Sequence, residues 1–169
     1  NGDTIAGPGW TLEAVHTPGH MSNHHCFALK DKNLLFSGDH VMGWNTTIVS
    51  PPDGNMREYM DSLRVCLARD EDLYLPGHGP EITNTKPFVR AYLNHRLMRE
   101  AQIAKFLNEG ADTIPELVRR MYTHLPEKMH GAAARSVQAH MEHMVGTNRA
   151  TCDGPVTASS VFAPGPASA

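Results

Sequence analysis

The sequence has few cysteines and no long apolar segment. Its three cysteines, Cys26, Cys66 and Cys152, are an odd number and form no C-x-x-C pair, which argues against a disulfide framework. This usage is typical of a reducing compartment, so we expect a cytoplasmic protein. No run of about 18 apolar residues is present, so we expect neither a membrane-spanning helix nor a membrane partner.

The sequence also has little net charge, −3, but its charges are unevenly spread along the chain. Residues 1–89 hold 6 Lys or Arg against 11 Asp or Glu, whereas residues 90–149 hold 9 against 6. The basic bias of the second segment is compatible with contact to a polyanion. A solvated helical surface explains it more simply.

The number of histidines is unusually high for this length, with 11 copies, and several stand in glycine-bearing turns that follow short apolar strands. Three such segments matter: residues 17–20 (Thr-Pro-Gly-His), 37–40 (Ser-Gly-Asp-His) and 75–80 (Leu-Pro-Gly-His-Gly-Pro). They present His20, Asp39 and His78, at spacings of 19 and 39 residues. Imidazole and carboxylate are ligands that zinc, manganese and iron accept, and glycine lets the backbone bend toward a shared centre.

The apolar patterns predict an α/β protein. Alternation and turn residues predict strands at residues 10–15, 25–29, 34–36 and 73–75. Helical spacing predicts helices over residues 56–68 and 86–108, another starting at the Thr113 to Glu116 capping box, and a last one over residues 129–145. Strand, helix, strand in this order favours a layered arrangement.

The three histidine and aspartate segments resemble the third, fourth and fifth ligand motifs of the metallo-β-lactamase superfamily. The resemblance implies that His20 is a ligand of the first metal, Asp39 bridges two metals with a catalytic role, and His78 is a ligand of the second. Residues 38–56 and 94–100 resemble a subgroup closest to the β-lactamase-like endoribonuclease. That subgroup carries a C-terminal winged-helix-like domain.

The resemblance implies a fold and a domain division. We expect the C-terminal part of a metallo-β-lactamase αββα sandwich over residues 1–95, a winged-helix-like helical domain over residues 96–162, and a flexible tail over residues 163–169. The first family motif, H-x-H-x-D-H, and the histidine of the second are absent from the sequence. We therefore expect a fragment whose N-terminal part is missing, or a protein that has lost its site, and this chain alone to be inactive.

Other side chains are candidates for contact with substrate. His24 lies four residues after His20, and Thr46 and Thr47 lie in the irregular segment after Asp39. A strand-surface histidine and loop hydrogen bonds are the simpler readings of these three. His95 and Arg96 could orient the cavity or bind phosphate, or belong to a paired helix surface.

The resemblance implies a hydrolase that uses metal-activated water, with two Zn²⁺ in a complete site and Mn²⁺ or Fe²⁺ as alternatives. The substrate is a small molecule or RNA, with nuclease activity the leading guess from the subgroup alone. A thioesterase of the glyoxalase II type and a lactam hydrolase are alternatives. Two further alternatives to the hydrolase function are a non-catalytic fragment and a nucleic-acid-binding winged-helix module. Self-association through the exposed half-sandwich is also expected.

Overall fold

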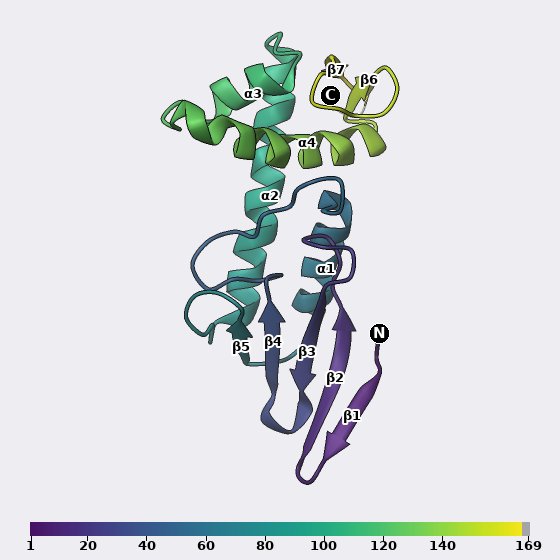
Figure 1. The fold of residues 1–169 in the computed structure, drawn as a ribbon, viewed down its shortest axis with the longest axis vertical. Helices are drawn as coiled ribbons and strands as arrows, with labels where there is room; N and C mark the ends of the chain where they lie inside the picture. The colour runs from purple at the N-terminus through teal and green to yellow at the C-terminus, as the bar shows by residue number, and fades with distance from the viewer. Residues whose placement is uncertain (167–169) are drawn as a thin grey trace. The chain divides into compact units, whose positions relative to one another are not determined.

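The computed structural model describes residues 1–166, and the chain divides into two compact units (Figure 1). The first unit comprises Asn1–Ile48 and Asp53–His95. The second unit comprises Val49–Pro52 and the chain from Arg96 onward. Each unit is described by itself below.

A five-stranded sheet forms the first unit. Its strands lie in chain order: β1 (Thr4–Gly7), β2 (Trp10–His16), β3 (His25–Leu29), β4 (Leu34–Gly38) and β5 (Leu73–Pro76). The first four pair antiparallel, whereas β5 pairs parallel to β4. A parallel pair needs a crossover connection, and helix α1 (Met56–Ala68) provides it. A short 3-10 turn (Lys30–Lys32) links β3 to β4.

Helix α1 covers one face of the sheet. It begins at Asn55, whose side chain accepts a hydrogen bond from the Glu58 N–H, as an N-cap residue does. The buried residues of α1 recur every three or four positions, so they form one face of the helix, and this face packs against every second residue of the strands. The Tyr74 hydroxyl on β5 donates to the Cys66 carbonyl of α1 at 3.2 Å. The fully buried side chains of this core are Val15, Cys26, Ala28, Leu35, Tyr59, Leu63 and Tyr74.

The opposite face of the sheet is apolar and partly open. Phe27 and Phe36 are cross-strand partners on it, and their exposed fractions are 41% and 40%. Trp10 is 41% exposed. Cys26, next to Phe27 on β3, points instead to the α1 side and is fully buried, because strand side chains alternate between faces.

Helices dominate the second unit. They are the later part of α2 (Thr85–Asn108), α3 (Ile114–Met121) and α4 (His130–Gly146), with a 3-10 turn (Glu127–Met129) before α4. Thr113 is the N-cap residue of α3, as predicted, but its side chain does not make the hydrogen bond of a capping box. The core contains Ile103, Leu107, Leu117, Val118, Val137, Met141 and Met144.

A two-stranded hairpin follows α4. Strands β6 (Ala150–Cys152) and β7 (Phe162–Pro164) pair antiparallel, with Cys152 opposite Phe162. Ala163 and Pro164 were expected in a flexible tail, and this part of the expectation is wrong because both form strand β7. Residues 167–169 lie outside the described residues. Within residues 1–166, no helix combines the length and the apolar character that crossing a membrane requires.

Candidate active site

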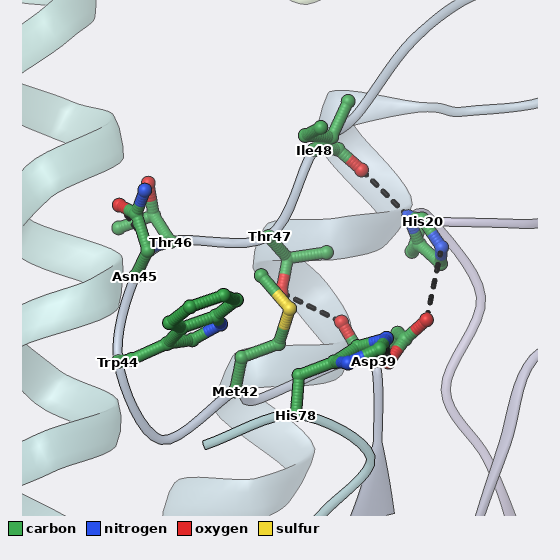
Figure 2. A pocket seen from close by; sticks show the side chains of 9 residues that line it. All are labelled: His20, Asp39, Met42, Trp44, Asn45, Thr46, Thr47, Ile48 and His78. Carbon is green, nitrogen blue, oxygen red and sulfur yellow. Dashed lines mark hydrogen bonds and ion pairs between the residues drawn. The ribbon is translucent and has the colours of Figure 1, made fainter.

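His20, Asp39 and His78 come together at one edge of the sheet in the first unit. They follow strands β2, β4 and β5, respectively. These three strands point the same way, because β2 and β4 both run antiparallel to β3 and β5 runs parallel to β4. Figure 2 shows the three side chains facing a common space. This grouping is the one that the family resemblance of the three segments implied.

Each histidine faces a different oxygen of the Asp39 carboxylate. His20 Nε2 lies 3.8 Å from Oδ2, and His78 Nε2 lies 3.5 Å from Oδ1. Two ligand atoms that share one ion, each at about 2.1 Å, lie roughly 3.4 Å apart in a tetrahedral site. The spacings are thus compatible with ions between the side chains. Within the described residues, no three His, Cys, Asp or Glu side chains form a closed metal cluster, so this set would need further ligands.

The ring of His20 is oriented by its other nitrogen. Nδ1 lies 2.6 Å from the Ile48 carbonyl, and because a carbonyl only accepts, Nδ1 carries the proton and donates. In the neutral tautomer with this bond, Nε2 carries the lone pair and faces Asp39 (Figure 2). A backbone carbonyl that fixes the tautomer in this way is typical of metal-binding histidines.

Helix α1 holds the turn that presents His20. The Ser62 hydroxyl donates to the Pro18 carbonyl at 2.8 Å, and the Asn55 N–H donates to the Gly19 carbonyl at 2.9 Å. Gly19 has a φ of +127°, and a Cβ there would overlap the Tyr59 backbone. Only glycine therefore permits this approach of the turn to α1.

Asp39 is held through its backbone by two neighbours. Its N–H donates to His24 Nε2 at 3.2 Å, and its carbonyl accepts from the Thr47 hydroxyl at 2.6 Å. His24 Nδ1 in turn donates to the Thr17 hydroxyl at 2.9 Å. Burial, with the nearby His20, lowers the pKa of His24, which keeps its ring neutral and able to accept from Asp39.

These contacts change the expected roles of His24 and Thr47. His24 lies behind Asp39 and outside the cavity lining, where its ring holds the Asp39 backbone, so the expected contact with substrate does not fit this position. Thr47 lines the cavity but is only 2% exposed, and its hydroxyl is committed to the Asp39 and His40 carbonyls. The adjacent His40 is fully buried against the Tyr59 ring, and burial lowers its pKa to about 3.

The His78 turn is packed tightly against the Asp39 turn. Gly77 N–H donates to the Gly38 carbonyl, and Gly43 N–H donates to the His78 carbonyl, each at 2.8 Å. A Cβ on Gly77 would lie 2.7 Å from Asp39 Oδ1. Glycine at this position is therefore what allows His78 and Asp39 to be neighbours.

A cavity of about 480 Å³ opens over the three side chains. Its wall is the loop of residues 42–48, and Figure 2 shows this loop facing His20, Asp39 and His78. Trp44 and Ile48 on this loop are 74% and 68% exposed. The lining residues are His20, Asp39, Met42, Trp44, Asn45, Thr46, Thr47, Ile48 and His78.

His95 and Arg96 lie elsewhere. His95 lines a neighbouring hollow of about 360 Å³, where it shares Trp44, Asn45 and Thr46 with the main cavity. Arg96 is 4% exposed, belongs to the second unit and lines neither cavity. Because the Arg96 side chain is buried and lines neither cavity, the expected contact of Arg96 with substrate does not fit this position.

Tyr92 is a site residue that the sequence did not reveal. Its hydroxyl donates to the Met42 carbonyl at 2.5 Å and to the Asn45 carbonyl, so it holds both ends of the short turn that carries Trp44. The available signal was weak: Tyr92 precedes His95 by three residues and therefore shares its helix face.

Comparisons with known proteins match both parts of the chain. Residues 1–78 match the metallo-beta-lactamase superfamily, and residues 113–154 match the beta-lactamase associated winged helix domain. A beta-lactamase-like protein 2 homolog of Caenorhabditis elegans is 32% identical over 139 residues, which are 82% of this chain and 46% of the relative. An atrochrysone carboxyl ACP thioesterase of Aspergillus chevalieri is 31% identical over 135 residues, 75% of this chain and 42% of the relative.

A solved structure shares the fold. The crystal structure of a beta-lactamase domain protein from Burkholderia ambifaria has a TM-score of 0.86 at 21% sequence identity. The match covers 96% of this chain and 50% of that one. The chain thus spans about half the length of the curated relatives it matches.

Proposed function

Because the chain belongs to the metallo-β-lactamase superfamily and carries its associated winged-helix domain, we propose that it forms part of a metal-dependent hydrolase. The family and the α/β fold class predicted from the sequence are confirmed. The observation that carries the proposal is the position of His20 and His78, each facing one oxygen of Asp39.

The donor set suits a divalent metal ion. Two imidazoles and a carboxylate are ligands of zinc and iron, and the Ile48 carbonyl fixes the His20 tautomer that such a ligand needs. When bound, the ion supplies the acidity that makes water a nucleophile near neutral pH. The chain itself orients His20 through Ile48 and holds the backbone of Asp39 through His24 and Thr47.

The cavity favours an uncharged carbonyl substrate over a phosphodiester. Its lining contains the apolar side chains of Met42, Trp44 and Ile48, and none of its described lining residues is Lys or Arg. A site for phosphate groups generally presents such cations. The name of the Aspergillus chevalieri relative agrees with this preference, so we place thioester hydrolysis first, with lactam hydrolysis and RNA cleavage as the alternatives to test.

The proposal is tested by hydrolysis assays on this chain and on any longer protein that contains it. The substrates are an acyl N-acetylcysteamine thioester, S-lactoylglutathione, nitrocefin and a fluorescent single-stranded RNA, each with Zn²⁺, Mn²⁺ or Fe²⁺ and with chelator. We expect metal-dependent thioester cleavage by a longer protein that supplies the further ligands, abolished there by Asp39→Asn, and little or no cleavage by this chain alone. The matched control is Asp61→Asn, because Asp61 is an exposed α1 residue whose carboxylate pairs with Arg64 away from the cavity. Hydrolysis that survives chelation or Asp39→Asn would overturn the proposal.

A further inference from the structure

The hollow beside the candidate site is built largely from aromatic rings. It is lined by Trp44, Phe88 and Tyr92, together with Asn45, Thr46, Ala91 and His95. The Phe88 and Tyr92 rings lie 5.3 Å apart at an angle of 33°. Trp44, Asn45 and Thr46 line both this hollow and the Asp39 cavity, so the two spaces share one wall.

The loop that carries the shared wall is bound to the protein on one side and leaves apolar side chains in solvent on the other. The Thr47 hydroxyl donates to the Asp39 carbonyl, and the Ile48 carbonyl accepts from His20 Nδ1. The Trp44 side chain is 74% exposed, which stabilises the fold little. A large exposed aromatic side chain next to a cavity that is lined by candidate metal-ligating side chains is typical of a binding surface.

Tyr92 fixes the position of the Trp44 turn. Its hydroxyl binds the Met42 and Asn45 carbonyls, on either side of Trp44, while its ring is 6% exposed and packs beside Phe88. The helix thus holds the loop through Tyr92 and supplies the partly exposed Phe88 ring to the hollow, with the buried Tyr92 ring behind it. The hollow is therefore prearranged for a ligand that stacks on rings.

We infer that Trp44, Phe88 and Tyr92 form a subsite for a flat aromatic group on the substrate, whose scissile carbonyl lies over Asp39. The role in catalysis rests on the proposed hydrolase function, whereas the binding of an aromatic group does not. Flat rings gain offset-stacked or edge-to-face contacts here that a saturated ring of similar size does not gain. The side chains of Asn45 and Thr46 are placed to bind polar substituents of that ring.

The test is a nuclear magnetic resonance titration of the full chain, without metal, with neutral 2-naphthamide and with cyclohexanecarboxamide. The chain has two tryptophans, Trp10 and Trp44, and therefore gives two indole N–H signals. A Trp10→Phe variant loses one of them and so assigns both. We expect saturable shifts of the Trp44 signal with 2-naphthamide and a response to cyclohexanecarboxamide that is weaker by about fivefold or more. Trp10 on the open sheet face serves as an internal control.

Two variants sharpen the test. Phe88→Ala should weaken 2-naphthamide binding about fivefold, whereas Phe27→Ala on the open sheet face should leave it unchanged. Tyr92→Phe keeps the ring but removes the hydroxyl, so the Trp44 signal should broaden before any ligand is added. Equal responses to both amides, a shift at Trp10 alone, or no effect of Phe88→Ala would overturn the subsite. If metal-dependent hydrolysis is found together with any of these results, the proposed function stands and the subsite is wrong. If the aromatic amide binds but no hydrolysis is found, the subsite stands and the proposed function is wrong.

Discussion

Two carboxylates of this chain each face two histidines, and they differ in almost every other respect. Asp39 in the first unit is 37% exposed, and its histidines stand 3.5 and 3.8 Å away, beyond hydrogen-bond distance. Glu100 in the second unit is fully buried. His143 Nδ1 lies 2.7 Å from its Oε1, and Arg149 Nη2 lies 2.5 Å from its Oε2.

The difference separates a structural group from a candidate functional one. Around Glu100, His140 adds a third contact at 3.3 Å, so the carboxylate is surrounded by donors and joins α2, α4 and the start of β6. Burial raises the pKa of Glu100, but the hydrogen bonds from His140, His143 and Arg149 outweigh it and lower the pKa to about 2. Asp39 has its backbone held while its carboxylate oxygens remain turned to a cavity. The same residue types therefore stabilise the fold in one unit and leave binding capacity in the other.

The largest effect is expected from removing the buried carboxylate. Glu100→Ala should lower the free energy of unfolding by about 3 to 5 kcal/mol, because it leaves buried donors that had been bonded to a charge. Urea unfolding measures this. Asp39→Ala is the matched change in the exposed cluster and should cost about 1 kcal/mol or less. Equal losses in the two variants would break the comparison.

Lowering the pH should weaken the Glu100 cluster and thereby lower the stability of the fold. The pKa of Glu100 lies near 2 in the folded chain against an ordinary value of 4.5, so its contribution is present above pH 4.5 and is lost as pH falls toward 2. The shift corresponds to about 3 kcal/mol. Burial also lowers the pKa of His140, so below about pH 6.5 the unfolded chain binds a proton that the folded chain does not, which lowers stability in the same direction. Unfolding curves from pH 7 to pH 2.5 test this, and Glu100→Gln should flatten the dependence below pH 4.5; an unchanged slope would contradict the assignment.

A smaller effect should follow from loosening the Asp39 turn. Thr47→Val keeps the shape of the side chain but removes the hydroxyl that donates to the Asp39 and His40 carbonyls. The expected cost is about 1 to 2 kcal/mol, because buried acceptors lose a donor. Thermal unfolding gives the value. Thr46→Val, one residue earlier on the cavity wall, is the control and should change stability by less than about 0.5 kcal/mol.

The smallest expected effect concerns the open face of the sheet. Phe27 and Phe36 stand opposite each other on it, and we propose that this face mediates self-association of the chain. Phe36→Lys should lower the average mass measured by sedimentation at high protein concentration. Val65→Lys, a change at an exposed apolar residue of α1, should not. A monomer at every concentration before any substitution would remove this proposal.

The sequence predicted most of the strands and helices, because glycine turns and apolar periodicity are local signals. The grouping of His20, Asp39 and His78 was implied by the resemblance to the metallo-β-lactamase superfamily. The sequence did not predict that His24 lies behind Asp39, since that depends on how β3 sits beside the Gly38 turn. Burial of Arg96 was equally hidden from local pattern.

The Glu100 network was also invisible in the sequence. His140 and His143 share a helix face by their three-residue spacing, but their partner lies 40 and 43 residues earlier in the chain. Tyr92 illustrates the same limit, because its hydroxyl binds backbone carbonyls that are 47 and 50 residues away. Contacts of a side chain with a distant backbone leave no sequence motif.

One measurement addresses the central contrast directly: the histidine ring signals of the chain followed by nuclear magnetic resonance during titration with paramagnetic Co²⁺. With only three ligands from this chain, we expect weak binding, with a dissociation constant above the micromolar range. The signals of His20 and His78 should broaden first, and Asp39→Asn should suppress the effect, while His140 and His143 around Glu100 should be unaffected. Broadening at His140 and His143 before His20 and His78, or no response at His20 and His78 up to millimolar Co²⁺, would contradict the assignment of His20, Asp39 and His78 as metal ligands.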